Sequence, residues 1–348
     1  PFSIMKKILV CGLGSIGQRH VRQIKKLLNN KIEIRALRLR KQNIVITDQL
    51  QVKSGVIPED EYNLKVFYSI DEAFNWKPDV VFITNPISMH IETAILAAEV
   101  GASIFIEKPL GCSLKGLSKL KKLVEEKNLT CMIGYQMRYH PGYKKAKEII
   151  AKGTIGEIIY GDFHFGEWLP GMHPYEDYKT SHASKKEQGG GVIFCLSHKI
   201  DLAYWMFGLP FSIYALGGKI SNLELNVEDN VDIMLGYKNA KYRFPLHIHL
   251  DFIQNKKKCY LNIIGNKGSV YFDYCKNELI LNINNKQESI ITYNEFERND
   301  MFMMELKDFF SCVKSKEDTP ITLNDGINVL EICLKSHNSL KNNLVEFF

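Results

Sequence analysis

The chain has 348 residues, of which 45% are hydrophobic and 24% are charged, and its formal net charge is +6. This balance is typical of a globular protein of about two domains and excludes disordered and fibrous classes. The lysines are dispersed in short pairs and triplets, which argues against a nucleic-acid partner. No apolar stretch approaches the roughly 18 residues of a membrane span. The eight cysteines form no C-x-x-C pair, so we expect reduced thiols in a cytoplasmic protein.

Residues 5–134 are expected to form the first domain, because strand-like apolar runs alternate there with helix-like repeats. The predicted strands are Lys7–Cys11, Ile32–Arg38, Val66–Tyr68, Val80–Thr84, Ser103–Ile106 and Thr130–Gly134. The predicted helices are Ile16–Leu28, Ile70–Phe74, His90–Val100 and Lys115–Lys127. This alternation predicts βαβ units in a doubly wound parallel sheet, the Rossmann architecture of the α/β class. Residues 1–4, which precede Met5, are treated as a remnant outside the fold.

Residues 135–348 are expected to form a second α/β domain with an open, mostly antiparallel sheet. A helix near Pro141–Lys152 and a strand over Ile158–Glu167 precede a polar, aromatic loop at 168–188. One helix is then predicted from the glycine run 189–191 to about Phe207. Strands follow at Val231–Tyr237, Tyr242–Leu250, Lys258–Ile264, Ser269–Tyr274 and Leu279–Ile283, and helices at Asp300–Lys314 and about Asp325–Lys341.

The first candidate site is the loop Gly12-Leu13-Gly14-Ser15-Ile16-Gly17, a G-x-G-x-x-G motif. In a dinucleotide fold, the first glycine permits the tight turn and the second lets the backbone approach a pyrophosphate. The third glycine lets the helix pack on the strand, and the helix N-terminus offers free N–H groups to the phosphates. The motif is weak alone, but here it lies between a predicted strand and a predicted helix, which is its confirming context.

The second strand lacks the acidic residue that binds a ribose 2′-OH about 20 residues after such a loop. Arg38 stands at that place instead. A guanidinium there can pair with a 2′-phosphate, so NADP is favoured over NAD. The alternative is an arginine that faces solvent at a strand end.

Two further strand ends carry polar residues, at the edge where open α/β sheets bind ligands. Thr84 and Asn85 can hydrogen-bond a ribose or a nicotinamide, whereas His90 is equally well explained as a solvent-facing residue at a helix start. Lys108 follows the next strand, within Glu107-Lys108-Pro109. Its ammonium group can stabilise charge on a substrate oxygen, although by itself it is one of many lysines.

A third cluster follows the glycine run in the second domain. Cys195, His198 and Asp201 recur at a spacing of three, which on one helix places neighbours on the same face. A histidine held by a carboxylate can accept a proton from an alcohol being oxidised. The alternative is a glycine-capped helix with a buried histidine.

Two other segments were weighed for ligands. The loop at 168–188 offers hydroxyl, acidic and aromatic groups that suit a sugar, and a plain surface loop is the alternative. His247 and His249 share one face of a predicted strand, but no further ligand set is apparent in the sequence. Sheet packing is therefore the favoured interpretation, and no metal is expected.

Together these motifs resemble the glucose–fructose oxidoreductase / inositol dehydrogenase family, Gfo/Idh/MocA, over essentially the whole chain. Glu107-Lys108-Pro109 matches its most specific motif, E-K-P. The other matching segments are Gly12–Gly17 as the cofactor loop, Asn85-Pro86 with His90 for T-P-N-x-x-H, Gly134–Tyr139 for G-[FY]-N-x-R-[FY], and His198 with Asp201 for H-x-x-D.

The resemblance implies reversible hydride transfer between NAD(P) and a secondary alcohol of a sugar, nucleotide-sugar or cyclitol. It also implies a homodimer or homotetramer formed through the second-domain sheet, and the 168–188 loop resembles members associated with bacterial surface-sugar pathways. Lys108 and His198 would hold the substrate, with His198 as the acid/base. Cofactor contacts are expected from Gly12, Gly14, Ser15, Ile16, Gly17, Arg38, Thr84, Asn85, Pro86, His90, Glu107, Lys108 and Gln136. Substrate contacts are expected from Arg138, Tyr175, Asp177, Tyr178, Cys195 and Asp201.

One position departs from the family pattern. Many members carry an aspartate three or four residues before the helix histidine, where this chain has Cys195. A thiol cannot supply that carboxylate. Either Lys108 and His198 suffice, or a residue of the 168–188 loop substitutes, or the protein is a cofactor-binding regulatory or scaffold relative without turnover.

Overall fold

The structure is a computed structural model that describes residues 5–28, 32–39, 43–284 and 286–348. The chain separates into two compact units, each described here by itself. The first unit comprises residues up to Tyr135 with Pro174–Glu176 and Arg298–Ile327, and the second comprises Gln136–His173, Asp177–Glu297 and Asn328–Phe348. Helix α10 (Arg298–Ser315), placed in the second domain by sequence, thus belongs to the first unit. Within the described residues, no helix has the length and apolar character needed to cross a membrane.

The first unit is built on a six-stranded parallel sheet with the order β5-β2-β1-β6-β7-β8. The strands are β1 (Lys7–Cys11), β2 (Glu33–Leu37), β5 (Lys65–Phe67), β6 (Val80–Ile83), β7 (Ser103–Glu107) and β8 (Cys131–Gly134). Every residue of β6, β7 and β8 is buried, as expected of strands covered on both faces. The strand order reverses at β1, and this switch point is where open α/β sheets bind ligands.

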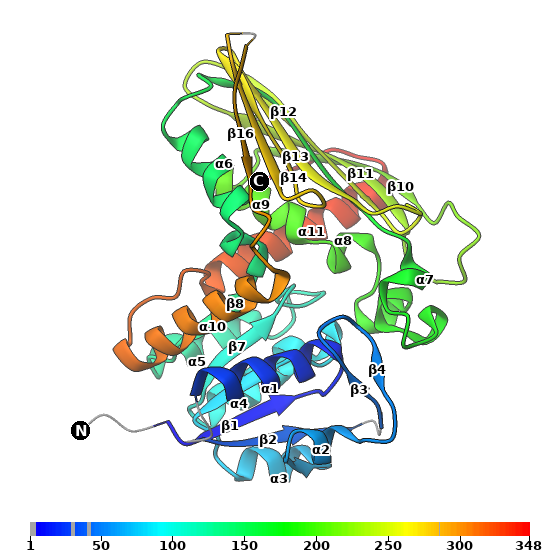
Figure 1. Ribbon diagram of the computed structural model, residues 1–348, viewed down its shortest axis with the longest axis vertical. Helices are drawn as coiled ribbons and strands as arrows, with labels where there is room; N and C mark the ends of the chain where they lie inside the picture. The colour runs from blue at the N-terminus through cyan, green and yellow to red at the C-terminus, as the bar shows by residue number, and fades with distance from the viewer. Residues whose placement is uncertain (1–4, 29–31, 40–42, 285) are drawn as a thin grey trace. The chain divides into compact units, whose positions relative to one another are not determined.

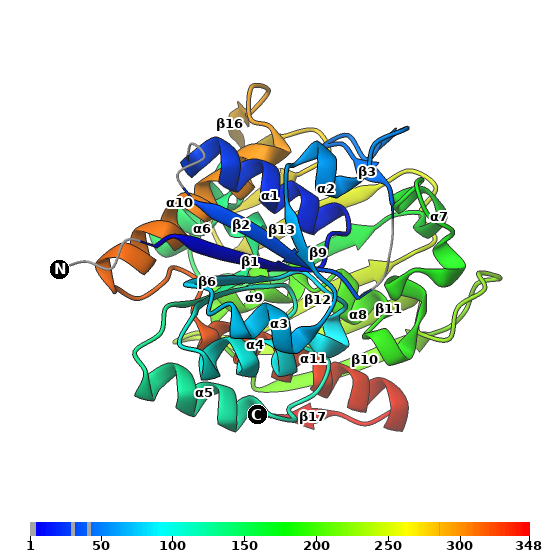
Figure 2. The ribbon, with the colours of Figure 1, turned by 90° about the horizontal axis from the view of Figure 1, so that it is seen from below.

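Helices cover both faces of this sheet, which confirms the predicted Rossmann architecture. Helices α1 (Ser15–Leu28) and α10 lie together on one face, and α4 (His90–Glu99) and α5 (Leu117–Glu126) lie on the other (Figure 2). The remaining helices are α2 (Pro58–Glu61) and α3 (Ile70–Asn75). A hairpin of β3 (Val45–Ile46) and β4 (Val52–Lys53) was not predicted, because two-residue strands carry no periodic signal.

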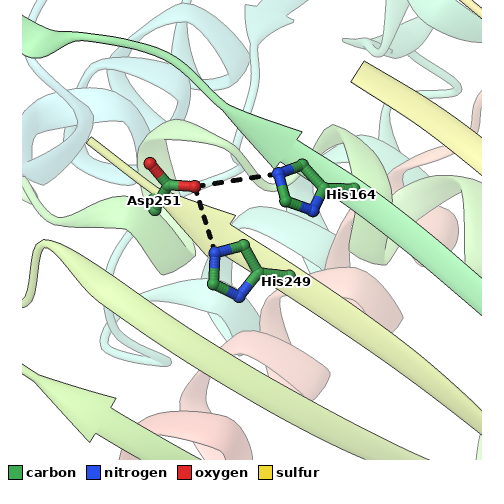
Figure 3. Close-up of side chains that lie close together, drawn as sticks. All are labelled: His164, His249 and Asp251. Carbon is green, nitrogen blue, oxygen red and sulfur yellow. Dashed lines mark hydrogen bonds and ion pairs between the residues drawn. The ribbon is translucent and has the colours of Figure 1, made fainter. Parts of the chain in front are cut away.

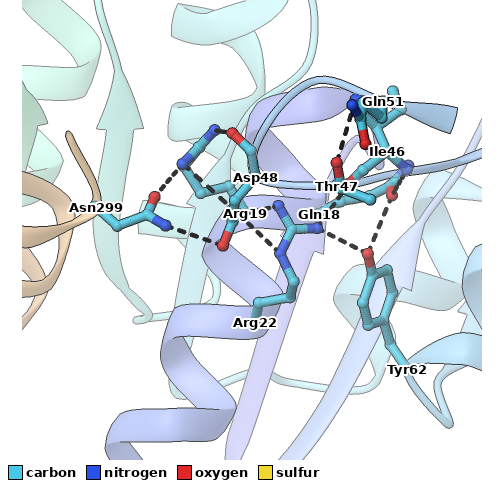
Figure 4. A network of polar contacts seen from close by, with 9 residues as sticks. All are labelled: Gln18, Arg19, Arg22, Ile46, Thr47, Asp48, Gln51, Tyr62 and Asn299. Atoms are coloured by element: carbon cyan, nitrogen blue, oxygen red, sulfur yellow. Dashed lines mark hydrogen bonds and ion pairs between the residues drawn. The ribbon is translucent and has the colours of Figure 1, made fainter. Parts of the chain in front are cut away.

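A polar network joins α1 to α10 and to the chain after β2 (Figure 4). The Arg19 guanidinium contacts the Asn299 side-chain oxygen and donates to the Asp48 carbonyl oxygen at 3.0 Å. Asn299 Nδ2 donates to Asp48 Oδ2 at 2.9 Å. Gln18, beside Arg19, donates to the Leu13 carbonyl oxygen at 3.0 Å, so the network also restrains the glycine loop. These contacts give a physical reason why a helix so late in the chain belongs to the first unit.

The second unit contains a nine-stranded sheet with the order β16-β15-β14-β13-β9-β12-β11-β10-β17. The strands are β9 (Ile158–Gly166), β10 (Ser212–Gly218), β11 (Asn230–Lys238), β12 (Arg243–Asp251), β13 (Lys258–Gly265), β14 (Gly268–Asp273), β15 (Glu278–Ile283), β16 (Lys286–Thr292) and β17 (Glu346–Phe347). The prediction of a mostly antiparallel sheet is confirmed. Its parallel pair, β9 with β12, joins strands that no short turn connects, because β9 lies far earlier in the chain.

Helices α6 (Pro141–Ala151), α8 (Val192–Cys195), α9 (His198–Phe207) and α11 (Leu323–Asn342) lie along one face of this sheet (Figure 1). Alternate residues of β12, from Phe244 to Leu250, are buried against that layer. The residues between them lie on the opposite face, where Pro245 is exposed and His247 and His249 are partly buried. Side chains alternate across a strand, so the two faces differ in chemistry.

The single helix predicted after the glycine run is wrong, because the chain forms two helices, α8 and α9. Between them, the Ser197 and Lys199 amides reach carbonyl oxygens only three residues back, each at 3.4 Å. This interrupts the regular α-helical ladder. Cys195 and His198 therefore do not share a helix face, whereas His198 and Asp201 both belong to α9.

Candidate active site

The glycine loop connects β1 to α1 with the backbone that a dinucleotide requires. Gly12 has a φ of 106°, a region that side chains disfavour. A Cβ on Gly17 would lie 2.0 Å from the Gly12 carbonyl oxygen, so only glycine permits this helix–strand approach. A Cβ on Gly14 would have no heavy atom within 4 Å. The space over Gly14 and the N–H groups at the start of α1, near Ser15 and Ile16, fit a pyrophosphate.

Tyr175 belongs to the first unit, beside this loop. Its hydroxyl is hydrogen-bonded with the Ser15 side chain, and burial raises the pKa of Tyr175 above its ordinary value. Tyr175, which the sequence predicted as a substrate contact, is thus bonded to the loop that was predicted to bind the cofactor phosphates. The sequence had no signal for this, because the two residues are far apart in the chain.

Arg38 follows β2 and is only 4% exposed, so the interpretation as a solvent-facing arginine is wrong. Its guanidinium forms an ion pair with the Glu59 carboxylate of α2. The other Glu59 oxygen, Oε2, is buried without a hydrogen-bond partner among the described residues. An acidic side chain from another segment therefore lies beside Arg38, which sequence spacing could not reveal.

Thr84 and Asn85 follow β6, next to the glycine loop. The Thr84 hydroxyl donates a hydrogen bond to the Gly12 carbonyl oxygen at 2.8 Å and thereby stabilises the loop. Asn85 Nδ2 donates to the Thr93 hydroxyl at 2.9 Å. Asn85 Oδ1 is buried and has no hydrogen-bond partner among the described residues, so it is available as an acceptor.

His90 is 1% exposed, which overturns the solvent-facing interpretation. Its Nδ1 lies 2.8 Å from the Pro109 carbonyl oxygen and its Nε2 lies 2.9 Å from that of Asn85. Burial lowers the pKa of His90. Both ring nitrogens thus contact backbone, and His90 joins the loop after β6 to the loop that carries Lys108. The Lys108–Pro109 peptide bond is cis.

Glu107 is the last residue of β7, and its side chain reaches helix α1. Its Oε1 lies 2.6 Å from Nε2 of His20 on α1, and both side chains are nearly or fully buried. The His20 ring packs against Phe82, Phe105 and Phe302. Sequence analysis missed His20, since nothing in the spacing of these residues links α1 to the E-K-P motif. The pair positions the strand end immediately before Lys108.

In the second unit, His198 begins α9 and is 5% exposed. Its Nε2 lies 3.4 Å from the side-chain nitrogen of Gln136. The sequence paired Asp201 with His198; in the structure both Asp201 oxygens accept hydrogen bonds from Arg138, the shortest at 2.6 Å. Asp201 is fully buried and Arg138 is 4% exposed, so this ion pair is internal.

The other predicted substrate residues lie at separate places in the second unit. Asp177 caps a short 3₁₀ helix by accepting from the Lys179 amide at 3.0 Å. The Tyr178 hydroxyl accepts from the Glu224 amide at 3.3 Å. Cys195 ends α8 and is 7% exposed.

Glu228 closes the N-terminal end of α8, where its Oε1 accepts from the Ile193 amide at 3.1 Å. Burial raises the pKa of Glu228 from 4.5 to about 7. The neighbouring His337 lies 3.7 Å from Oε1, and burial lowers its pKa to about 4, so it provides no cation near neutral pH. The carboxyl is thus held in a place that favours its neutral form.

We expect Glu228→Gln to stabilise the protein above pH 7 and to leave stability unchanged below pH 4.5. A raised folded-state pKa means that the native state binds the proton more tightly, so stability falls as pH rises from 4.5 to 7 and then stays low. The shift corresponds to roughly 3 kcal/mol. Urea unfolding at pH 4.5 and pH 8 measures it, with Glu224→Gln, an exposed glutamate, as the control. Equal stability of Glu228→Gln and the unsubstituted protein at pH 8 contradicts the prediction.

A doubly wound parallel sheet, a glycine loop at its switch point and polar residues at its strand ends are typical of a dinucleotide-binding protein. The description "Oxidoreductase family, NAD-binding Rossmann fold" matches residues 6–135, and "GFO/IDH/MocA C-terminal domain" matches residues 143–271. The chain belongs to the Gfo/Idh/MocA oxidoreductase family, which confirms the resemblance drawn from its motifs.

The relatives of this chain include inositol and sugar dehydrogenases. The scyllo-inositol 2-dehydrogenase (NAD(+)) of Bacillus subtilis (strain 168) is 28% identical over 275 residues, which is 76% of each chain. A structure of levoglucosan dehydrogenase in complex with NADH has a TM-score of 0.83 and 17% identity over 98% of each chain. The WlbA dehydrogenase from Bordetella pertussis, in complex with NADH and UDP-GlcNAcA, has a TM-score of 0.80 and 17% identity over 100% of this chain and 99% of its own. At such identities the structural likeness shows a shared fold.

Proposed function

We propose that the protein transfers a hydride between NAD(P) and a secondary alcohol or ketone of a sugar, nucleotide-sugar or cyclitol. The observation that carries this proposal is the set of buried contacts that hold the chain on both sides of Lys108. The buried Glu107–His20 pair fixes the strand end before it, and His90 holds the loop after it against the Asn85 loop. A lysine supported from both sides, on the same sheet edge as the glycine loop, is suited to orient a substrate oxygen.

Oxidation of an alcohol removes a hydride from carbon and a proton from oxygen. When bound, the dinucleotide supplies the hydride acceptor. We propose that Lys108 donates a hydrogen bond to the reacting oxygen and that His198 accepts its proton. In the reverse direction, His198 returns the proton to the ketone oxygen. The near-complete burial of the His198 ring favours a proton transfer shielded from bulk water.

The substrate class rests on the relatives as well as on this chemistry. Their names include an inositol dehydrogenase, a levoglucosan dehydrogenase and a dehydrogenase complexed with UDP-GlcNAcA. Polyhydroxylated rings are common to all three. We extend the proposal to surface-glycan synthesis, on the likeness of the 168–188 loop, and to a homo-oligomer that pairs through the open sheet face of the second unit.

The test is cofactor binding followed by turnover. Fluorescence titration measures the affinity for NADH and NADPH, and absorbance of the reduced nicotinamide measures turnover with inositols, anhydrosugars and UDP-sugars. Turnover with one of these classes supports the proposal. Binding without turnover across the panel favours the non-catalytic relative that Cys195 suggests, and failure to bind either cofactor refutes both.

Arg38 selects NADP in our proposal, and the Glu59 ion pair sets the strength of that selection. We expect Arg38→Ala to weaken NADPH binding by ~10-fold or more while NADH binding changes little, because only NADPH carries the 2′-phosphate. Glu59→Gln is expected to act in the opposite direction, since it leaves the guanidinium without its carboxylate. The ratio of the two dissociation constants is the measurement. A ratio unchanged in both variants means that Arg38 does not read the 2′ position.

A further inference from the structure

His164, His249 and Asp251 lie together on the partly open face of the second-unit sheet (Figure 3). They come from the adjacent parallel strands β9 and β12, in which His164 is paired with His249. One potential ligand atom from each residue lies within 4.8 Å of the other two. The two imidazole rings are stacked, with centroids 4.7 Å apart, and Figure 3 shows a nitrogen of each directed at the same Asp251 oxygen.

Asp251 is a fully buried carboxylate whose two oxygens contact different groups. Oδ1 accepts from the amides of Ile253 and Gln254, each at 2.9 Å. Oδ2 faces the histidines, at 3.0 Å from His249 Nε2 and 3.8 Å from His164 Nε2. A Cβ on Gly166 would lie 2.2 Å from Oδ2, so the glycine leaves the space that this oxygen occupies.

A second carboxylate fixes the His249 ring from its other side. Asp232 Oδ1 lies 2.7 Å from His249 Nδ1. In a neutral ring whose Nδ1 donates its hydrogen to Asp232, Nε2 presents a lone pair toward Asp251 Oδ2 at 3.0 Å. A proton on Nε2 or a metal cation between the two atoms removes this repulsion. A histidine oriented by an outer carboxylate is also a typical arrangement around protein-bound metals.

His164 supplies the third donor. Its Nε2 is a buried atom without a hydrogen-bond partner among the described residues. A buried polar atom without a partner is costly, and coordination satisfies it.

We propose that His164, His249 and Asp251 bind a borderline divalent cation such as Zn²⁺, with water completing the coordination. Two imidazoles and a carboxylate form a ligand set typical of this ion. Ligand distances to Zn²⁺ are about 2.0–2.2 Å, so binding would draw together three ligand atoms that lie within 4.8 Å of one another. The bound ion joins β9 to β12, and Asp232 acts as a positioning residue through His249.

The site goes beyond the proposed oxidoreductase function and does not depend on it. It also goes beyond the sequence analysis, which weighed His247 with His249. Nitrogens of His247 lie 2.9 Å from Asp162 and 2.8 Å from Asp232, so that histidine belongs to the surrounding network. The partners of His249 are brought in by strand pairing and by the end of β12.

The test is titration of the untagged, chelator-treated protein with Co²⁺ and Zn²⁺, read by visible absorption and calorimetry. We expect one equivalent of Co²⁺ with the spectrum of a low-symmetry nitrogen and oxygen site, displaced by Zn²⁺. His164→Phe keeps the stacked ring but removes the nitrogen, and is expected to weaken binding by at least ~100-fold. Asp232→Asn is expected to weaken it by roughly 10-fold. Cys275→Ser, which removes an exposed thiol, is the control and leaves binding unchanged.

X-ray absorption of the zinc-loaded, unsubstituted protein identifies the ligands directly and does not depend on whether a variant folds. Two imidazole ligands with the rest oxygen support the site. Sulfur ligands, no binding of either metal, or equal affinity in His164→Phe overturn the proposal.

Discussion

Replacement of Lys108 by methionine is expected to lower kcat by about 10²–10³-fold while the affinity for NADH or NADPH changes little. Methionine keeps a flexible apolar stem but removes the ammonium group, so the variant loses a hydrogen-bond donor to the reacting oxygen. The magnitude is that of one donor aimed at developing charge in a site sheltered from water. Steady-state kinetics on the substrate found in the panel, together with cofactor titration, measures both quantities.

Lys115→Met is the matched control, because Lys115 is an exposed lysine of the same loop region. It should retain full turnover. Lys108→Arg is expected to recover only part of the rate, since a planar guanidinium does not place its donors where the ammonium does. A kcat of Lys108→Met within about threefold of the starting protein means that the support around this loop serves the fold rather than the chemistry.

Replacement of Asp201 by alanine is expected to lower the free energy of unfolding by about 3–5 kcal/mol. The Asp201 carboxylate is fully buried and accepts three hydrogen bonds from Arg138, so its removal takes these bonds and a buried negative charge away from the guanidinium. Urea unfolding of the full chain at neutral pH measures the loss of stability. Added salt should change it little, because a buried pair is poorly screened.

A double-mutant cycle separates this pair from simple loss of packing. Arg138→Met removes the charge while it keeps a long apolar side chain, and the double variant Arg138→Met/Asp201→Ala removes both charges. We expect the double variant to be less destabilised than the sum of the single variants. Additive effects would show that the two charges do not depend on one another.

The Rossmann half was predictable because its signals are local. Alternating apolar runs set the strands and helices, and the loop Gly12–Gly17 sits between the elements that its function requires. The E-K-P motif, at the end of β7, was identified from adjacent residues in the same way. The helix break before His198 was not predictable, because no glycine or proline marks it in the sequence. Hydrophobic periodicity alone continues across it.

Sequence alone therefore determined the family and the fold class and made Lys108 and His198 the predicted catalytic residues, since each of these depends on residues close together in the chain. Tertiary structure decided which distant groups meet. It paired His20 with Glu107, Glu59 with Arg38, and Arg138 with Asp201. It also brought His164 beside His249 and Asp251 through the parallel pairing of β9 and β12. Strand order and burial decide such partners, because a buried charge or polar atom is costly without a counterpart. The spacing of residues in the sequence does not reveal which residue that counterpart is.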